Sequence, residues 1–308
     1  MSRRGLRIAV APDTDGRVAA AARGEGAEVV PLDQAEALAW TVSDPARFPT
    51  ELPDGVRWVQ LPSAGVEAWF AAGTIDAARV WTSAAGAYAA PVAEHALMLL
   101  LAGVRRLPES LAADTWRKTE LRPRVGTLAG ARVAIIGAGG IARALIPSLT
   151  ALGADAIAVN RSGRPVPGAA RTVAADAAED VWSAADHVVI AAPQTAQTHH
   201  LVGGRRLARM KSTAWLVNVA RGTLVDTDAL LHALDTGGIA GAALDVTDPE
   251  PLPDGHPLWT HPRAIVTPHV ANPTATLAAA LDTRLAENIR RYRDGAALLG
   301  VVDAAVGY

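Results

Sequence analysis

Six short apolar runs recur between residues 131 and 268, and they constrain the fold more than any other feature of the chain. Each run is six or seven residues long and consists mainly of β-branched or small apolar side chains. Runs of this kind are typical of parallel strands that are buried on both faces of a sheet. The runs are ARVAIIG, DAIAVN, HVVIAA, AWLVNVA, AGAALDV and RAIVTP.

Stretches long enough for crossover helices separate these runs, so the chain alternates between strand and helix. The first hundred residues repeat the alternation, with alanine-rich helical segments between three strand-like runs, LRIAVA, VRWVQL and ARVWTS. The pattern predicts an α/β fold with two Rossmann-like, doubly wound parallel-sheet domains and a cleft between them.

The domain boundary is predicted where the amphipathic helix of PVAEHALMLLLAGVRRL ends before Pro108. We place the substrate domain at residues 1–103, completed by a C-terminal helix within 278–308 that stops at Gly295. The dinucleotide-binding domain would then span residues 104–277.

Composition argues against several kinds of partner. The 308 residues include 29 Lys and Arg and 31 Asp and Glu, a formal net charge of -2, which gives no electrostatic reason to expect nucleic acid or an anionic membrane. No cysteine is present, which rules out disulfides and thiolate chemistry. The apolar runs are too short for a signal peptide or for the ~20 residues of a membrane helix, so we expect a cytoplasmic protein.

A glycine-rich turn follows the first of the six runs. Residues 137–142 read GAGGIA, the dinucleotide-binding pattern with Ala142 in place of the third glycine. Gly137 would permit the tight turn, and Gly139 would let the main chain approach a pyrophosphate. Gly140 and Ile141 would open a helix whose N–H groups and dipole favour that anion. We predict that a dinucleotide cofactor binds here.

The end of the second run favours NADP over NAD. An NAD-binding unit usually has an acidic residue about twenty positions after the glycine motif. Here Asn160 stands near that position, and Arg161, Ser162 and Arg164 follow it. A carboxylate would repel a 2′-phosphate, whereas guanidinium groups and a hydroxyl would bind one. The alternatives are a solvated turn with no ligand, or a site that also accepts NAD.

Three segments of the second half resemble the signatures of the D-isomer-specific 2-hydroxyacid dehydrogenases: NVARGTLVD, ALDVTDPEPLP and TPHVAN. In the first half, LPSAGVEAW resembles the family's substrate-binding loop and PVAEHALMLLLA its domain-crossing helix. NRSG after the second run is similar to the NADPH-preferring glyoxylate and hydroxypyruvate reductases. The resemblance implies an oxidoreductase that transfers a hydride between NADP(H) and a small 2-keto or 2-hydroxy acid, most often as a homodimer joined through the cofactor domain.

The three catalytic residues that the resemblance implies have side chains suited to this reaction. Arg221 follows a buried apolar run, where a guanidinium is rare unless an anion meets it. Its planar fork would bind the substrate carboxylate and polarise the carbonyl oxygen. His269 would donate a proton during reduction and accept one during oxidation. Glu250 would hydrogen-bond the imidazole and fix its tautomer.

The same resemblance assigns supporting contacts. The main chain of the substrate loop would offer N–H groups to the substrate carboxylate at Ala64, Gly65 and Val66. Around the cofactor the resemblance places Pro193 near the nicotinamide, Thr198 near the phosphates or ribose, the main chain of Val219 and Ala220 along the nicotinamide site, and Asp245 close to the nicotinamide ribose or amide.

The remaining histidines give no case for a metal. His199 and His200 are adjacent but have no acidic residue close in the sequence, which makes them weak candidates for metal ligands. His95 lies in the middle of a predicted helix, and we predict a structural role for it. No metal site is therefore expected.

Two other functions stay open from the sequence. A nucleotide-sensing, corepressor-like scaffold on the same fold could keep Arg221, Glu250 and His269, although no basic tail or peptide-like appendage is visible. A phosphite or other dehydrogenase of the superfamily is the second alternative. Among 2-keto acids, glyoxylate, hydroxypyruvate and bulkier acids all fit the pattern.

Overall fold

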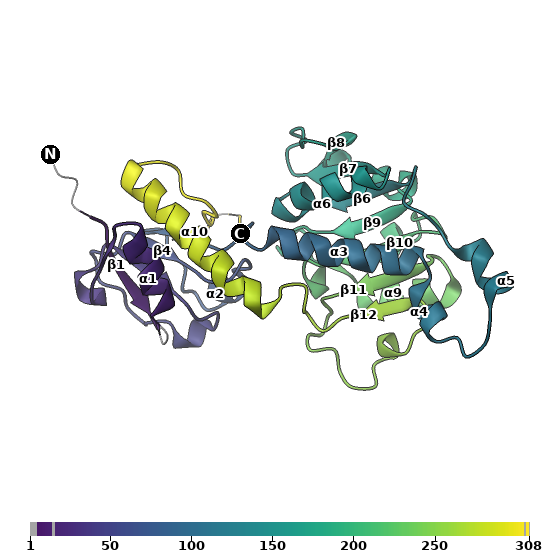
Figure 1. Ribbon diagram of the computed structural model, residues 1–308, viewed down its shortest axis with the longest axis horizontal. Helices are drawn as coiled ribbons and strands as arrows, with labels where there is room; N and C mark the ends of the chain where they lie inside the picture. The colour runs from purple at the N-terminus through teal and green to yellow at the C-terminus, as the bar shows by residue number, and fades with distance from the viewer. Residues whose placement is uncertain (1–4, 14–15, 305, 308) are drawn as a thin grey trace. The chain divides into compact units, whose positions relative to one another are not determined.

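The computed structural model describes residues 5–13, 16–304 and 306–307, and these form two compact units (Figure 1). Unit 1 contains the described residues of Met1–Tyr88 and Pro273–Tyr308, and unit 2 is Ala89–Asn272. Each unit is built on a parallel sheet, so the predicted α/β fold class is confirmed.

Unit 2 is built on a larger sheet in which the described residues form seven parallel strands, in the order β12-β11-β10-β9-β6-β7-β8. The order reverses between β6 and β9, which makes this the switch point of a doubly wound sheet. The strands are β6 (Arg132–Ile136), β7 (Asp155–Asn160), β8 (Arg171–Ala174), β9 (His187–Ile190), β10 (Trp215–Asn218), β11 (Gly241–Leu244) and β12 (Ala264–Val266).

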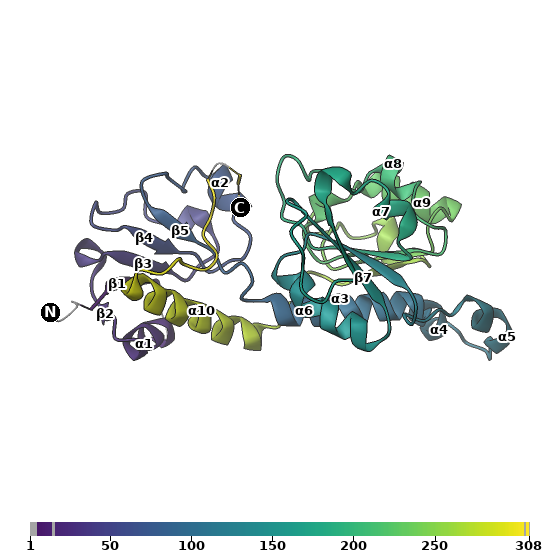
Figure 2. The same ribbon diagram turned by 90° about the horizontal axis from the view of Figure 1, so that it is seen from above.

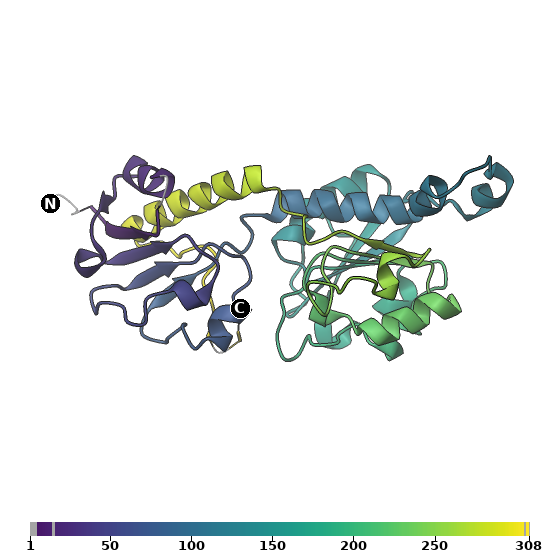
Figure 3. The same ribbon diagram turned by 90° about the horizontal axis from the view of Figure 1, so that it is seen from below.

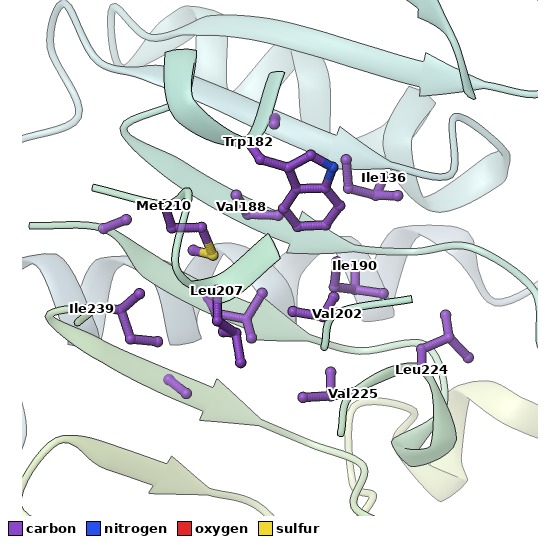
Figure 4. Close-up of a cluster of buried hydrophobic side chains, with 14 of the residues drawn as sticks. Ile136, Trp182, Val188, Ile190, Val202, Leu207, Met210, Leu224, Val225 and Ile239 are labelled. Carbon is purple, nitrogen blue, oxygen red and sulfur yellow. The ribbon is translucent and has the colours of Figure 1, made fainter. Parts of the chain in front are cut away.

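Helices cover both faces of the larger sheet, which explains why its central strands are apolar at successive positions. In β6, Val133 and Ile135 pack with α3 and α6, whereas Ala134 and Ile136 face the opposite core. Figure 4 shows that opposite core, where Trp182 and Met210 lie over the sheet. The helices of unit 2 are α3 (Ala89–Val104), α4 (Leu107–Leu111), α5 (Lys118–Leu121), α6 (Gly140–Ala151), α7 (Val181–Ala184), α8 (Gly204–Leu207) and α9 (Thr227–Thr236).

The observed boundaries between the units differ from the predicted ones. The predicted division at residues 103 and 104 falls at the end of α3, but the whole helix belongs to unit 2. The reason is that Leu99 and Leu100 are buried in the same core as β6 and α6, and α3 packs along α6. The chain returns to unit 1 at Pro273 instead of residue 278.

Unit 1 is built on a smaller sheet, in which the described residues form five parallel strands in the order β2-β1-β3-β4-β5. Figure 2 shows α1 and α10 on one face of this sheet and α2 on the other, and the buried side chains divide in the same way. The elements are β1 (Arg7–Ala11), α1 (Arg17–Gly24), β2 (Glu28–Val29), β3 (Ala37–Trp40), β4 (Trp58–Gln60), α2 (Glu67–Ala71), β5 (Val80–Thr82) and α10 (Thr274–Asp294).

A buried polar network fastens α10 to the smaller sheet. Asn288 donates from Nδ2 to Gln60 Oε1 (2.9 Å), and Thr82 Oγ1 donates to the same oxygen (2.9 Å). Asn288 also accepts from Leu299 N (2.8 Å), which secures the segment after the helix. Since buried polar groups are costly unless they are paired, this network fixes one seating of α10. Gly295, in a left-handed conformation, ends the helix at the predicted position.

Helices α4 and α5 form an arm that projects from the body of unit 2 (Figures 1 and 3). Two large apolar side chains on this arm are open to solvent, Leu111 at 77% and Trp116 at 91%. Across the described residues, no helix combines the length and the apolar character needed to cross a membrane.

Candidate active site

The predicted site residues of unit 2 gather at the carboxyl edge of the larger sheet. The register aligns the strand ends, because Ile136 pairs with Val159 and Ile190, and Leu244 pairs with Asn218 and Val266. The loops that leave these ends carry the glycine turn, the Asn160 turn, Arg221, Glu250 and His269. In open α/β sheets this edge is where ligands bind.

The glycine turn has the conformation that a dinucleotide site requires. Gly137 has φ 103°, and a Cβ on it would lie 2.4 Å from Ala192 N, so no other residue fits there. A Cβ on Gly139, by contrast, would meet no protein atom within 4 Å. Packing therefore does not require a glycine at position 139, whereas the close approach of a phosphate would. Ala142 is fully buried where α6 meets the sheet, and the main-chain N–H groups of α6 begin at Gly140 and Ile141. These residues fit a dinucleotide.

The Asn160 turn lies beside the glycine turn, since Gly137 N donates to Val159 O (2.9 Å). Asn160 closes the turn by donating from Nδ2 to Arg164 O (2.8 Å). Ser162 Oγ accepts from Arg164 N (3.3 Å). The side chains of Arg161, Ser162 and Arg164 are exposed. Two guanidinium groups and a hydroxyl are thus exposed on the turn that adjoins the glycine turn.

A second turn follows β9 on the opposite side of the glycine motif. Thr198 Oγ1 donates to Pro193 O (2.7 Å) and accepts from Thr195 N (2.8 Å). The Thr198 hydroxyl therefore holds the turn together. Pro193 is exposed on the same turn, near the carboxyl end of β9.

Asn218 shapes the main chain around Arg221. Its buried side chain accepts from Ala220 N at Oδ1 (3.1 Å) and donates from Nδ2 to Arg221 O (2.8 Å). Val219 and Ala220 are buried, whereas Arg221 is half-buried and donates from Nη1 to Ala220 O (2.7 Å). Asn218 thus fixes the main chain of the bend immediately before the Arg221 side chain.

Glycine follows Arg221 because the main chain after β11 comes very close at this point. A Cβ on Gly222 would lie 1.8 Å from the carbonyl oxygen of Thr247, closer than any van der Waals contact. The short helix η5 (Gly222–Leu224) starts here and leads the chain to α9. The Arg-Gly pair therefore combines a polar side chain at the sheet edge with close packing behind it.

Glu250 and His269 are brought together from the loops after β11 and β12. His269 Nδ1 lies 2.6 Å from Glu250 Oε1, and the two side chains are 50% and 39% exposed. A charge-assisted hydrogen bond of this length fixes the orientation of the ring and leaves Nε2 as the other ring nitrogen. Arg221, Glu250 and His269 thus follow three neighbouring strands, β10, β11 and β12.

Asp245 has a different environment from the one expected of a cofactor contact. Its side chain is 1% exposed, and it accepts from Thr267 Oγ1 (2.6 Å), Val270 N (3.0 Å) and Ala271 N (3.1 Å). These groups belong to the loop that carries His269, so Asp245 is bonded to that loop at three of its residues. The geometry gives no support for a direct contact with the nicotinamide ribose or amide.

Sequence reasoning missed two residues of this arrangement, Thr267 and Asn218, and gave His95 no chemical role. His95 Nε2 lies 3.1 Å from Asp245 Oδ1 and 3.0 Å from Thr267 Oγ1. His95 and Thr267 are far apart in the sequence, so no local pattern reports their contact. Asn218 could have been found, because an amide at the end of a buried strand must satisfy its hydrogen bonds locally.

The two adjacent histidines stack on each other, with ring centroids 4.0 Å apart, and His200 Nδ1 is 3.9 Å from Asp226 Oδ2. Among the residues that the structure describes, no group of three or more His, Asp or Glu side chains is placed to hold a metal ion.

The predicted substrate loop belongs to unit 1 and leads into α2. Ser63 Oγ donates to Gly65 O (2.8 Å), and Val66 is the residue from which α2 begins. Ala64 is exposed at the tip of this loop. Behind the loop, the large aromatic side chains of unit 1 are buried in its core and do not line the surface: Trp40, Trp69, Trp81 and Tyr88.

Comparisons with known proteins agree with this geometry. The family model described as "D-isomer specific 2-hydroxyacid dehydrogenase, NAD binding domain" matches residues 95–271. The glyoxylate/hydroxypyruvate reductase A of Photorhabdus laumondii is 34% identical over 218 residues, covering 70% of this chain and 68% of the relative.

Two solved structures extend the likeness to both units. A D-isomer specific 2-hydroxyacid dehydrogenase from Xanthobacter autotrophicus, in complex with NADPH and MES, has a TM-score of 0.81 and 28% identity, covering 99% of each chain. The NADPH-dependent glyoxylate/hydroxypyruvate reductase of Sinorhizobium meliloti, in complex with NADP and sulfate, has a TM-score of 0.78 and 25% identity, covering 98% of this chain and 100% of the other.

Proposed function

The chain belongs to the D-isomer-specific 2-hydroxyacid dehydrogenases, oxidoreductases that use a nicotinamide cofactor, and on that premise we propose that it reduces small 2-keto acids with NADPH. The observation that carries the proposal is the 2.6 Å contact between His269 Nδ1 and Glu250 Oε1, on loops that adjoin the one bearing Arg221.

The catalytic residues would divide the reaction between a cation and a proton donor. Arg221 binds the substrate carboxylate and polarises the keto oxygen as negative charge develops on it. Because Glu250 holds Nδ1 of His269, the proton passes to that oxygen from Nε2, and it returns to Nε2 in the oxidation. A bound reduced nicotinamide supplies the hydride. The main chain of Ala64, Gly65 and Val66 is proposed to offer N–H groups to the substrate carboxylate.

The preference for NADPH rests on the Asn160 turn. No acidic side chain stands at the end of β7, and the exposed arginines beside the glycine turn suit a 2′-phosphate. The two solved relatives that contain NADPH or NADP support the same preference. The cofactor contacts proposed in full are Gly137, Gly139, Gly140, Ile141, Asn160, Arg161, Ser162, Arg164, Pro193, Thr198, Val219 and Ala220.

We also propose that the protein forms a homodimer and that it is cytoplasmic. The exposed Leu111 and Trp116 on the arm are large apolar groups for which burial against a second copy would be favourable.

The first test is the loss of reduced-cofactor absorbance with NADPH and with NADH, each against a panel of 2-keto acids. Glyoxylate and hydroxypyruvate head the panel because the relative from Photorhabdus laumondii is named for them. Turnover that is faster with NADPH supports both parts of the proposal. A preference for NADH would keep the catalytic assignment and reject the cofactor assignment. Tight cofactor binding without turnover would favour a nucleotide-sensing scaffold instead. Oxidation of phosphite would favour a phosphite dehydrogenase.

A further inference from the structure

A buried carboxylate lies directly beneath the loop that carries His269. The side chain of Asp245 is 1% exposed, and a buried charge is costly unless donors surround it. Among the described residues, every side-chain hydrogen bond or ion pair recorded for Asp245 involves either His95 or the loop 267–271. The carboxylate therefore links the His269 loop to α3.

His95 is the member of this cluster that comes from α3. Its side chain is 13% exposed, and Nε2 lies 3.1 Å from Asp245 Oδ1 and 3.0 Å from Thr267 Oγ1. The Thr267 hydroxyl already donates to Asp245 Oδ1 (2.6 Å), and a carboxylate can only accept. We therefore assign Nε2 of His95 as a donor, the fourth donor to a carboxylate that has about four acceptor positions.

The loop that this cluster holds is strained at His269 itself. His269 has φ 53°, a left-handed conformation that is unfavourable for a residue with a Cβ. Its N–H donates to Asp245 O (2.8 Å) and lies 2.9 Å from Thr267 O. The residues on both sides of His269 are bound to the Asp245 carboxylate. The strained conformation persists because these bonds outweigh its cost.

We propose that His95 is a positioning residue, which acts through Asp245 and Thr267 to keep the His269 imidazole in its reactive orientation against Glu250. The proposal rests on the proposed function of His269 as the proton donor. Loss of the His95 N–H would leave the buried carboxylate short of a donor, and the loop 267–271 would then sample other conformations. The proton donor would be misplaced while the glycine turn, which follows β6, stays intact.

The test compares three variants. His95→Phe keeps a planar ring but removes the donor, and His95→Gln restores an N–H near the position of Nε2. The matched control is His261→Phe, since His261 is 11% exposed and pairs with Asp235 (3.3 Å) away from the site. For each protein we would measure kcat, the KM for NADPH and for the keto acid, and the thermal midpoint.

We expect His95→Phe to lower kcat roughly 10- to 100-fold with the KM for NADPH unchanged, because a small misplacement of a catalytic group has effects of this size. His95→Gln should recover most of the loss, and His261→Phe should keep the wild-type kcat. The proposal is overturned if His95→Phe stays within about twofold of wild type, or if the glutamine variant is as impaired as the phenylalanine variant.

A second readout does not depend on turnover. In protein labelled with ¹⁵N-histidine, the ring signals of His269 are identified by their loss in His269→Gln. They should shift or broaden in His95→Phe, or in Thr267→Val if the phenylalanine variant does not fold, and should be unchanged in His261→Phe. Unchanged His269 signals in the folded His95 and Thr267 variants would refute the positioning role. A wild-type protein with no reductase activity would refute the proposed function but leave this spectroscopic result to decide the positioning.

Discussion

At the scale of single residues, the site consists of side chains whose main-chain supports are already in place. Asn218 fixes the bend before Arg221, and Asp245 binds Thr267 and Val270 on the two sides of His269. Under the proposed function, side chains held in this way would lose little entropy when a substrate binds. The residues that support the site are therefore as informative for mutagenesis as the residues that would touch substrate.

Replacing His269 by Gln should nearly abolish keto-acid reduction, by roughly 10²- to 10⁴-fold, because a positioned proton donor contributes that much. NADPH binding should be unchanged, since the glycine turn follows a different strand. Single-turnover kinetics and a fluorescence titration with NADPH measure the two effects. His232→Gln, on the exposed side of α9, is the control. Wild-type turnover in His269→Gln would remove the proton-donor role.

Replacing Arg161 by Ala should weaken NADPH binding about tenfold or more while changing NADH binding little, because only NADPH carries the 2′-phosphate. Dissociation constants for both cofactors, measured on the same variant, separate the two effects. Arg171→Ala, an exposed arginine at the start of β8, is the matched control. Equal losses for NADPH and NADH would eliminate the case for a phosphate site at the Asn160 turn.

Two glycines of the site should respond differently to alanine. Gly222→Ala would place a Cβ against the Thr247 carbonyl, and overpacking of this kind costs about 1–3 kcal/mol of unfolding free energy. Gly139→Ala meets no protein atom, so its stability should be retained while cofactor affinity falls. Urea unfolding and cofactor titration of both variants test the contrast. A stability loss at position 139 equal to that at position 222 would contradict it.

At the scale of secondary-structure elements, burial in the larger sheet affects a histidine that has no place in the proposed chemistry. His187, the first residue of β9, accepts from Trp215 N at Nδ1 (3.2 Å). Burial lowers the pKa of His187 to about 4; Asp186 opposes this shift and Lys211 adds to it. The folded protein therefore takes up this proton at a lower pH than the unfolded chain does.

The stability of the protein should consequently fall as the pH is lowered from about 6.5 to about 4, because the unfolded state binds more protons in that window. His187 would contribute up to about 3 kcal/mol to this loss. Urea unfolding of the wild type and of His187→Gln, near pH 7 and near pH 4.5, isolates its share. The glutamine variant should lose less unfolding free energy between the two pH values than the wild type does. An identical loss in both proteins would refute the contribution of His187.

Most strands of the fold could be predicted because burial on both faces leaves a continuous apolar run. All six runs of the second half contain strands, from β6 to β12 with β8 omitted. Strand β8 was not predicted, because it is an edge strand in which only Val173 is buried. Only alanine-rich helical segments were expected between LRIAVA and VRWVQL, but Ala37–Trp40 in that interval pairs with β1 and β4 and is buried as β3. Tertiary pairing thus outweighed local propensity.

The site could be predicted only in part, for a related reason. The resemblance to the family's signature segments predicted Arg221, Glu250 and His269, and the structure shows Glu250 bonded to His269. The environment of Asp245 depends on α3 and on the loop after β12, which meet only in the folded chain. The sequence pattern predicts which polar residues follow the end of a strand. It does not predict which distant segment of the chain packs behind those residues.

At the scale of the whole molecule, the arm formed by α4 and α5 offers a testable surface. If Leu111 and Trp116 are buried in a homodimer, replacing both by Glu should lower the sedimenting mass from that of a dimer to that of a monomer, because charged groups cannot be buried without partners. The control is Trp259→Glu, an apolar residue exposed elsewhere on unit 2. A wild-type protein that sediments as a monomer would contradict the homodimer.

The division of unit 1 into two chain segments has a consequence for how the protein is made. Unit 2 is continuous, but the core of unit 1 needs Leu285 and Ile289 of α10, which are translated long after Tyr88. At ribosomal speeds of about 5–20 residues per second, the smaller sheet waits roughly 10 to 40 seconds for that helix. The first segment of unit 1 therefore leaves the ribosome before unit 2 but completes its packing after it.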